Sequence, residues 1–289
     1  MEISGKTKLV GIFGDPVDHT ISPAMHNAAF EALGLDMAYV PFHVRKSPAT
    51  DLKTAVNAIR ALNLCGVNVT IPHKEKVLKY LDEVDPDAKA AGAVNTIVNR
   101  NGKLVGYNTD GPGYLLSLKE DIGFTVRGKR IVILGAGGAA RAILRSALEK
   151  RPASIVVANR TLKRAEDLIR EFEASYPVVM KAVGLLDSAI AQDLNNASLV
   201  VNTTSIGMKG TGAPDVPLEA LPRGSIVSDI VYVPLETAFL NAAKARGLRV
   251  HYGLSMLVRQ GALTFELWTG KKAPVEVMQR AALAALNLK

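Results

Sequence analysis

The stretch "KRIVILGAGGAARAILRSALEK" (residues 129–150) predicts a strand, a glycine turn and a helix in immediate succession. Its apolar run at 131–134 is typical of a buried parallel strand, and three glycines follow it directly. In this context the glycines allow a tight turn and a close approach to a pyrophosphate, which amide groups at the helix start can bind. An ordinary strand–helix turn is the alternative. The sequence therefore predicts a dinucleotide-binding turn, with candidate cofactor-binding residues Gly135, Ala136, Gly137, Gly138 and Ala139.

The next strand-like segment, "SIVVANRTLKRAEDL" (154–168), indicates which dinucleotide is bound. An NAD-binding unit usually places an acidic residue at the end of this strand, where it binds the ribose hydroxyls. Here the strand ends with Asn159, Arg160 and Thr161, and Arg164 lies one helical turn further on. A guanidinium group can bind a 2′-phosphate with two hydrogen bonds. These residues predict NADP as the cofactor, although two solvated surface arginines are the alternative.

The same alternation of strands and helices extends over almost the whole chain of 289 residues, which is typical of an α/β protein. Helical patterns are expected at about 23–33, 50–62 and 112–122, and "RNGK" (100–103) predicts the turn of a hairpin within 92–111. The segment from Leu254 onward is expected to be mostly helical. We therefore expect two α/β domains with a boundary near Thr109. Further strands are expected at 8–13, 37–44, 65–71, 198–205 and 225–232.

Composition excludes several classes of protein. Apolar residues make up 48% and charged residues 21%, and no apolar run approaches the roughly 20 residues of a membrane helix. The N-terminus lacks the features of a secretion signal, and a single cysteine, Cys65, suits a reducing cytoplasm. The net charge is +8, but lysines and arginines are spread along the chain, so anionic small molecules are better partners than nucleic acid. The five histidines lack metal-site spacing, and no metal is predicted.

Polar residues alternate with apolar ones in "CGVNVTIPHKEKV" (65–77). Val67, Val69 and Ile71 are expected to face a core, because strand side chains alternate between two faces. Asn68 and Thr70 then lie on the opposite face, and Lys74 follows Pro72. These three are candidate site residues. Their alternative is a solvated face of an edge strand followed by an exposed lysine.

Three other segments supply further polar candidates. In "TISP" (20–23), Thr20 and Ser22 stand at a helix start, where hydroxyls and free amides can bind a carboxylate. "GAVNT" (92–96) supplies Asn95, and "NTDG" (108–111) supplies Asp110. Asn95 and Asp110 could instead be ordinary turn residues, which such sequences favour.

Taken together, these motifs resemble the shikimate dehydrogenase family over nearly the full chain. Seven motifs occur in the family's order: "TISP", "NVTIPHK" (68–74), "GAVNT", "NTDG", "GAGG" (135–138), "NRT" (159–161) and "GLSMLVRQ" (253–260). One difference is that the family normally has serine where this chain has Thr20.

The resemblance implies an oxidoreductase that reduces 3-dehydroshikimate to shikimate with NADPH, reversibly, in chorismate and aromatic amino-acid biosynthesis. It implies that Lys74 and Asp110 are the catalytic pair and that Ile230 and Gly253 contact the cofactor. It also implies a substrate-binding catalytic domain at 1–109, completed by helices at 254–289, and a Rossmann-type NADP-binding domain at 110–253. The substrate contacts that it implies are Thr20, Ser22, Asn68, Thr70, Asn95, Tyr232 and Gln260.

Three other functions remain possible at this point. A dehydrogenase of dual specificity would also use quinate, which carries one more hydroxyl beside the carboxylate. A non-enzymatic NADP-binding sensor would not need Lys74 and Asp110 together. Glutamyl-tRNA reductase has a similar strand end, but it needs a nucleophilic cysteine in a longer chain. We expect a cytoplasmic monomer or homodimer that binds its small-molecule substrate and no nucleic acid or membrane.

Overall fold

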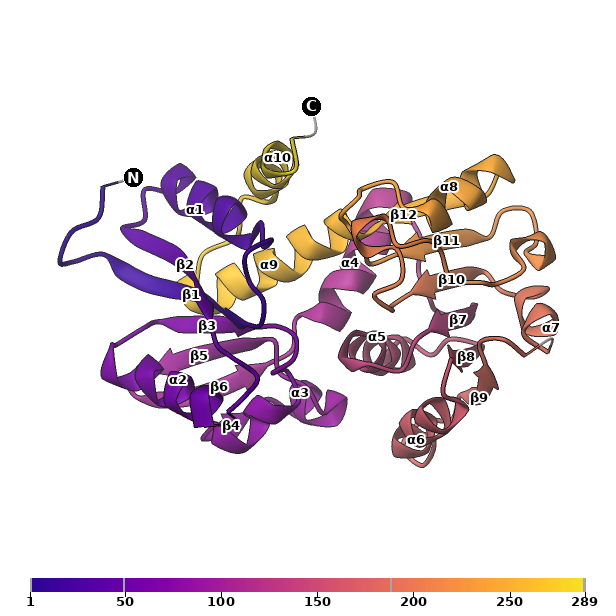
Figure 1. The fold of residues 1–289 in the computed structure, drawn as a ribbon, viewed down its shortest axis with the longest axis horizontal. Helices are drawn as coiled ribbons and strands as arrows, with labels where there is room; N and C mark the ends of the chain where they lie inside the picture. Colours follow the sequence, from indigo (N-terminus) through magenta and orange to yellow (C-terminus); the bar gives the residue numbers. More distant parts are fainter. Residues whose placement is uncertain (1, 49, 188, 288–289) are drawn as a thin grey trace. The chain divides into compact units, whose positions relative to one another are not determined.

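The computed structural model describes residues 2–48, 50–187 and 189–287. The chain divides into two compact units, one made of Met1–Gly113 with Val258–Lys289 and the other of Tyr114–Leu257. In the part of the chain that is described, each unit contains one six-stranded sheet with helices beside it (Figure 1). The predicted α/β class is confirmed. The borders of the units lie at Gly113 and Val258, compared with the expected borders at Thr109 and Leu254.

The sheet of the first unit has the strand order β2-β1-β3-β5-β6-β4. All neighbouring strands are parallel except at β5, which runs antiparallel to β3 and β6. The strands are β1 (Lys8–Gly14), β2 (Met37–His43), β3 (Gly66–Val69), β4 (Glu83–Val84), β5 (Thr96–Arg100) and β6 (Lys103–Tyr107). The helices that contribute to this unit are α1 (Ser22–Ala32), α2 (Thr50–Ala61), the 3-10 helix η1 (Lys76–Tyr80), α3 (Pro86–Ala91), the start of α4 (Asp110–Ile122), the end of α9 (Gly253–Thr269) and α10 (Val275–Ala285).

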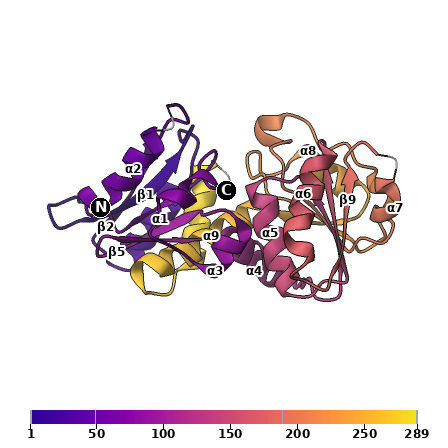
Figure 2. The same cartoon turned by 90° about the horizontal axis from the view of Figure 1, so that it is seen from below.

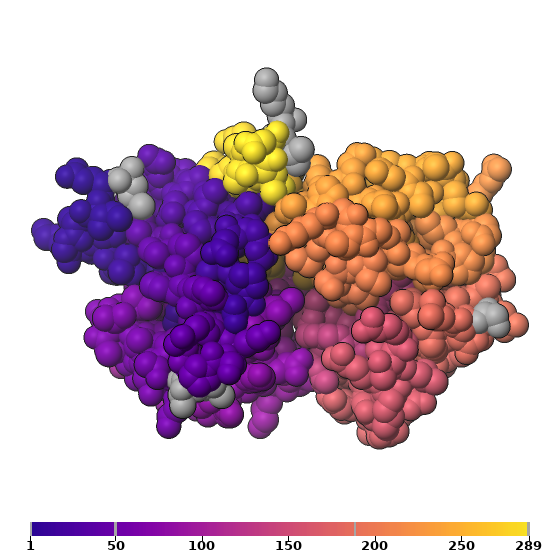
Figure 3. Space-filling model, in the orientation of Figure 1, coloured from indigo at the N-terminus to yellow at the C-terminus, as the bar shows by residue number. Residues whose placement is uncertain are grey.

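The two faces of β3 are covered by different helices. Val67 and Val69 are fully buried in a core that includes residues of α2. Asn68 points to the other face, where its amide lies within hydrogen-bond distance of Thr264 on α9. Helix α10 packs against α1 and forms part of the surface of this unit (Figure 3). Asn68 is buried, and β3 lies between β1 and β5 inside the sheet, so the alternative of a solvated face on an edge strand is wrong.

The expectation for Ile71 is also wrong. Strand β3 ends at Val69, and Ile71 is 69% exposed. The neighbouring strand β1 ends at Gly14, opposite residue 70. Residue 71 therefore lies beyond the ends of both strands, away from the core. Pro72 follows and lacks the backbone N–H that a continued strand would need.

The second unit has the strand order of a doubly wound dinucleotide-binding fold, β12-β11-β10-β7-β8-β9, and its paired strands are parallel. The chain enters at the centre on β7, adds β8 and β9 on one side, and then adds β10, β11 and β12 on the other. The strands are β7 (Arg130–Leu134), β8 (Ser154–Asn159), β9 (Val179–Gly184), β10 (Leu199–Asn202), β11 (Ile226–Asp229) and β12 (Arg249–Tyr252). The helices are α5 (Gly138–Glu149), α6 (Leu162–Glu173), α7 (Ile190–Leu194), α8 (Ala238–Ala245) and the 3-10 turns η2 (Met208–Gly210) and η3 (Leu218–Ala220).

Alternation along β7 shows why both faces of this sheet carry helices. Ile131 and Ile133 are buried in one cluster with residues of α5 and α6, which lie side by side (Figure 2). Val132 and Leu134 are buried in a second cluster with residues of α7 and α8. A continuously apolar strand covered on both faces is the arrangement expected of a parallel sheet.

The hairpin and the glycine turn form where the sequence predicts them. Asn101 and Gly102 both have positive φ between β5 and β6, which a two-residue hairpin turn of this kind requires. Strands β4, β9 and β12 were not predicted. All three lie at sheet edges. Strand β4 has only two residues, and exposed residues interrupt the apolar pattern of β9 and β12. None of the helices in the described ranges is long and apolar enough to cross a membrane.

Candidate active site

Lys74 and Asp110 form an ion pair in the first unit. Lys74 Nζ lies 2.7 Å from Asp110 Oδ2, and the side chains are 20% and 7% exposed. Lys74 precedes the short helix η1, and its carbonyl oxygen accepts a hydrogen bond from Val94 N. Asp110 is the first residue of α4, where the partial positive charge of the helix end favours a carboxylate. The fold therefore holds an ammonium group beside a buried carboxylate.

Asn95 connects this ion pair to the strands. Its Nδ2 donates to Asp110 Oδ1 at 2.8 Å and to Thr109 Oγ1 at 2.9 Å. Its Oδ1 accepts from the backbone N–H of Thr109 at 2.8 Å, which fixes the orientation of the amide. Asn95 is 3% exposed, so it is neither the solvated turn residue of the alternative interpretation nor a free surface amide. Each oxygen of the Asp110 carboxylate thus has its own donor.

Asn68 belongs to the same buried network. Its Oδ1 accepts from the hydroxyl of Tyr39 at 2.9 Å, and its Nδ2 donates to the carbonyl oxygen of Asn95 at 3.0 Å. Tyr39 is 3% exposed and stacks on His26, with ring centroids 4.6 Å apart. A tyrosine held in this way fixes which end of the Asn68 amide faces Asn95.

Helix α9 contributes Gln260 to the network. Gln260 Oε1 lies 3.3 Å from Asn95 Nδ2 and 3.5 Å from Thr109 Oγ1. The helix comes this close to α4 because residue 113 is glycine, and a Cβ there would lie 2.6 Å from the backbone nitrogen of Gln260. Five of the predicted site residues are therefore brought together: Asn68, Lys74, Asn95, Asp110 and Gln260.

Thr20, Ser22 and Thr70 follow the carboxyl ends of β1 and β3. Thr20 Oγ1 accepts from the backbone N–H of Ser22 at 3.3 Å, so its hydroxyl oxygen stabilises the start of α1. Ser22 is 6% exposed, and its own hydroxyl is not bonded to any residue that the structure describes. Thr70 is half-buried, and its methyl group occupies the space that a Cβ at Gly14 would need. The segments after β1 and β3 thus lie side by side, because Phe13 is paired with Val69.

The glycine turn joins β7 to α5 in the second unit. Gly135 has φ +112, and a Cβ there would lie 2.6 Å from Thr203 Oγ1, so both conformation and space require glycine. Among the residues that the structure describes, no atom outside the adjoining residues and the helix's own backbone lies within 4 Å of a Cβ built at Gly137 or Gly138. Ala136 and Ala139 are half-buried beside them. This turn leaves open space in front of the first amide groups of an α-helix, which fits a pyrophosphate.

The residues predicted to bind the 2′-phosphate follow β8. Strand β8 is parallel to its neighbour β7, so these residues lie at the same end of the sheet as the glycine turn. Asn159 ends β8, and its Nδ2 donates to the carbonyl oxygen of Thr161 at 2.8 Å. Arg160, Thr161 and Arg164 are exposed. Both guanidinium groups are therefore accessible to an anionic ligand.

Ile230, Tyr232 and Gly253 lie in the second unit, after the parallel strands β11 and β12. A Cβ at Gly253 would lie 2.4 Å from the carbonyl oxygen of Ile230, so the two backbones are in close contact. Tyr232 is half-buried, and burial raises the pKa of its hydroxyl. The segment that carries Ile230 and Tyr232 is held by Asp229, whose carboxylate accepts from Val231 N and from the hydroxyl of Thr237.

Sequence reasoning missed several members of the network in the first unit. Thr96 and Thr109 stand inside the quoted motifs "GAVNT" and "NTDG", so their positions were visible although no role was assigned to them. Thr264 lies one helical turn after Gln260, and this spacing places both residues on one face of α9. For Tyr39 the sequence offers no such signal.

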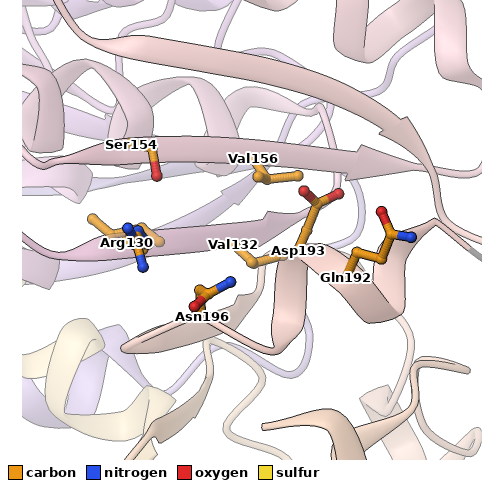
Figure 4. Close-up of a pocket in the computed structure, with 8 residues that line it drawn as sticks. Arg130, Val132, Ser154, Val156, Gln192, Asp193 and Asn196 are labelled. Atoms are coloured by element: carbon orange, nitrogen blue, oxygen red, sulfur yellow. The ribbon is translucent and has the colours of Figure 1, made fainter. Parts of the chain in front are cut away.

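A surface hollow of the second unit contains none of the predicted site residues (Figure 4). Arg130 and Ser154, which begin β7 and β8, line it together with Gln192, Asp193 and Asn196 from α7 and the residues beyond it. It lies at the amino ends of the strands, opposite the edge that carries the glycine turn. Ligands of doubly wound sheets bind at the carboxyl ends, so the hollow does not compete with the glycine turn as a cofactor site.

Comparison with known proteins identifies the family. Models of the shikimate dehydrogenase substrate binding domain, of shikimate / quinate 5-dehydrogenase and of the shikimate 5'-dehydrogenase C-terminal domain match residues 12–97, 117–207 and 253–283. The chain is 49% identical to a shikimate dehydrogenase (NADP(+)) of Symbiobacterium thermophilum, over 98% of this chain and 96% of that protein. It is 45% identical to that of Desulforamulus reducens, over 96% of this chain and 95% of that protein.

A solved structure agrees with these relatives. The shikimate 5-dehydrogenase of Thermus thermophilus, in complex with NADP(H) and shikimate, has a TM-score of 0.85 and 40% identity, covering 96% of this chain and 100% of that one. The chain belongs to the shikimate dehydrogenase family.

Proposed function

We propose that this chain catalyses the NADP-dependent, reversible reduction of 3-dehydroshikimate to shikimate, a step of aromatic amino-acid and chorismate biosynthesis. The observation that carries this proposal is the Lys74–Asp110 pair, held by Asn95 inside a network of amides and hydroxyls. The family membership supplies the substrate class, and the pair supplies groups suited to the chemistry.

The proposed reaction adds a hydride and a proton to a ketone. As the hydride reaches the carbonyl carbon, negative charge develops on its oxygen, and a nearby cation with a hydrogen to donate stabilises that charge. Lys74 is assigned this role, either by transferring a proton or by orienting the substrate and stabilising the charge. Asp110 holds the ammonium group in place through its Oδ2 atom, 2.7 Å away.

The other candidates suit a small polyhydroxy acid. Asn68, Asn95 and Gln260 offer amide groups to ring hydroxyls, and the Ser22 hydroxyl at the start of α1 is assigned to the substrate carboxylate. Thr20, Thr70 and Tyr232 are assigned as further substrate contacts. We assign substrate binding to the unit of residues 1–113 and 258–289, and cofactor binding to the unit of residues 114–257.

The cofactor residues of the second unit fit NADP. Bound NADPH supplies the hydride. The open space at Gly137 and Gly138 fits the pyrophosphate, and Arg160 and Arg164 supply positive charge for the 2′-phosphate. Asn159 and Thr161 are assigned to the same end of the cofactor, and Ile230 and Gly253 to the nicotinamide end.

The relatives reported above are named for shikimate, so the dual-specificity alternative with quinate is not favoured. Purified protein assayed with shikimate and with quinate, each with NADP and with NAD, tests both substrate and cofactor. We expect oxidation of shikimate with NADP to have the highest kcat/KM of the four combinations. No oxidation of shikimate with either cofactor would overturn the proposed function.

We also propose a cytoplasmic location. The reaction consumes NADPH, and the free thiol of Cys65 suits a reducing compartment. The choice between a monomer and a homodimer is decided by the mass measured with light scattering on the purified chain.

A further inference from the structure

We infer that Thr264, on helix α9, is a positioning residue that sets the direction of the hydrogen bonds around the substrate-binding amides. The side chain is fully buried, and its hydroxyl lies near three polar groups from three different segments. These are Thr96 Oγ1 at 2.8 Å, Thr109 Oγ1 at 3.1 Å and Asn68 Nδ2 at 3.4 Å. The inference rests on the proposed function, because it concerns how the same site binds its substrate.

We assign the directions of these bonds by counting hydrogens, with the Thr96 hydrogen placed on the carbonyl oxygen of the Asn95 side chain, which can only accept. The backbone N–H of Thr109 donates to Asn95 Oδ1, so that oxygen is an acceptor, and Thr96 Oγ1 donates its only hydrogen to it at 3.1 Å. Toward Thr264 the Thr96 oxygen can then only accept. Thr264 therefore donates to Thr96.

The contact between Thr264 and Thr109 follows from this assignment. The single hydrogen of Thr264 is used on Thr96, so its oxygen must accept at the contact with Thr109. One hydrogen of Asn68 Nδ2 goes to the carbonyl oxygen of Asn95, and the other faces Thr96 Oγ1 at 3.2 Å and Thr264 Oγ1 at 3.4 Å. The Thr109 hydroxyl consequently donates to Thr264, and its oxygen is available to accept from Asn95 Nδ2 at 2.9 Å. One threonine thus sets the directions of two neighbouring hydroxyls.

The consequence concerns the amide oxygens of Asn95 and Gln260. Thr109 Oγ1 also lies 3.3 Å from Asn95 Oδ1 and 3.5 Å from Gln260 Oε1, so the Thr109 hydrogen has three possible acceptors. With Thr264 present, the closest acceptor at 3.1 Å takes it. Without the Thr264 hydroxyl, the hydrogen turns toward one of these two amide oxygens and competes with a substrate hydroxyl for it.

Substituting the hydroxyl tests this role. In Thr264→Val, which keeps the branched shape, we expect KM for shikimate to rise about tenfold, the loss of roughly one oriented hydrogen bond. We expect kcat to change less than threefold and KM for NADP to stay at the wild-type value. Thr264→Ser restores the hydroxyl and should return KM for shikimate to within about threefold of wild type.

A matched control lies on the same helix. The hydroxyl of Thr269 donates to the carbonyl oxygen of Phe265, one turn earlier, so it serves its own helix. Thr269→Val should leave KM for shikimate unchanged. If Thr264→Val does not fold, Thr264→Ala makes the same test, because it removes the hydroxyl without adding a methyl group.

Two results would overturn the inference. One is a KM for shikimate in Thr264→Val within twofold of wild type. The other is an equal rise in KM for shikimate and for NADP that Thr264→Ser does not reverse, because it would show general damage to the fold. If the wild-type chain itself does not oxidise shikimate, the proposed function fails first and the inference fails with it.

Discussion

Lys74 Nζ lies 2.7 Å from Asp110 Oδ2, although the two residues are 36 positions apart in the chain. The bond joins the segment after β3 to the first residue of α4. Asp110 also accepts from Asn95 and stands at a helix N-terminus, so its carboxylate keeps two favourable interactions if Lys74 is removed. The pair can therefore be broken from the lysine side without leaving an isolated buried charge.

Lys74→Ala is expected to lower kcat for shikimate by about 10²–10⁴, because the charge on the reacting oxygen loses its stabilising cation and proton donor. Steady-state kinetics measure this loss. The variant should still bind NADPH, since the assigned cofactor residues belong to the other unit. Titration of NADPH fluorescence checks this binding.

A suitable control for the lysine is Lys76→Ala. Lys76 is exposed and begins η1 two residues later, so its removal should leave kcat unchanged. A Lys74→Ala enzyme that keeps more than about a tenth of wild-type kcat would remove Lys74 from the reaction.

Asp110→Asn is expected to lower kcat by a smaller factor than Lys74→Ala. The amide is similar in shape but has no charge to hold the ammonium group. Its NH₂ group would also face Lys74 Nζ or Asn95 Nδ2, which are donors themselves. Rates measured for the two single variants and the double variant test the coupling. Additive losses in log kcat would show that the two residues do not act as a unit.

The sequence predicted the glycine turn, the hairpin and the central strands well because each has a local signal. Glycines with positive φ and continuous apolar runs mark these elements without reference to distant residues. Edge strands such as β9 lack that signal, since one side of the strand is exposed and its residues are mixed. Ile71 was misassigned because its burial depends on where the neighbouring β1 ends.

Candidate site residues were easier to predict from the sequence than the residues whose hydrogen bonds hold them in place. Asn95 and Asp110 stand in compact motifs whose turn-forming residues are conspicuous in the sequence. Tyr39 supports Asn68 from another strand, 29 positions away, and no local pattern marks such a contact. Long-range hydrogen bonds of this kind depend on strand order, which the sequence does not display.

Ser22→Ala is expected to raise KM for shikimate, because it removes a buried hydroxyl assigned to the substrate carboxylate. Loss of one such bond corresponds to roughly a tenfold or greater change in KM.

Thr20→Ser keeps the oxygen that accepts from Ser22 N, so it should alter KM for shikimate only slightly. It also removes a methyl group and should improve the use of quinate, which is bulkier beside its carboxylate. A wild-type enzyme that prefers quinate to shikimate would contradict this steric argument.

Acid is expected to destabilise the first unit through His26. This residue is fully buried, neither ring nitrogen is bonded to a described residue, and burial lowers its pKa to about 3. The unfolded chain takes up the proton near pH 6.5, whereas the folded unit does not until about pH 3. The free energy of unfolding therefore decreases as pH falls, by about 2 kcal/mol between pH 7 and pH 5 from this residue.

His26→Phe removes the titrating group but keeps an aromatic ring against Tyr39, so this part of the pH dependence should disappear. Urea unfolding at pH 7 and pH 5 measures it, followed by fluorescence of Trp268. That residue is the single tryptophan of the chain, and its ring centroid lies 5.4 Å from that of His26. His19→Ala, at an exposed position, serves as the control and should keep the wild-type slope. An unchanged slope in His26→Phe would rule out this explanation.

Arg160→Ala is expected to weaken the binding of NADP by about ten- to a hundredfold, because a charge-assisted hydrogen bond to phosphate contributes roughly 1.5–3 kcal/mol. The residue is exposed after β8, so the substitution should leave the fold and the binding of NAD nearly unchanged. Isothermal titration with each cofactor measures both Kd values. Arg170→Ala is a matched control, since Arg170 is exposed on α6 and pairs with Asp167. Equal losses for NADP and NAD would show that Arg160 does not distinguish the cofactors by the 2′-phosphate.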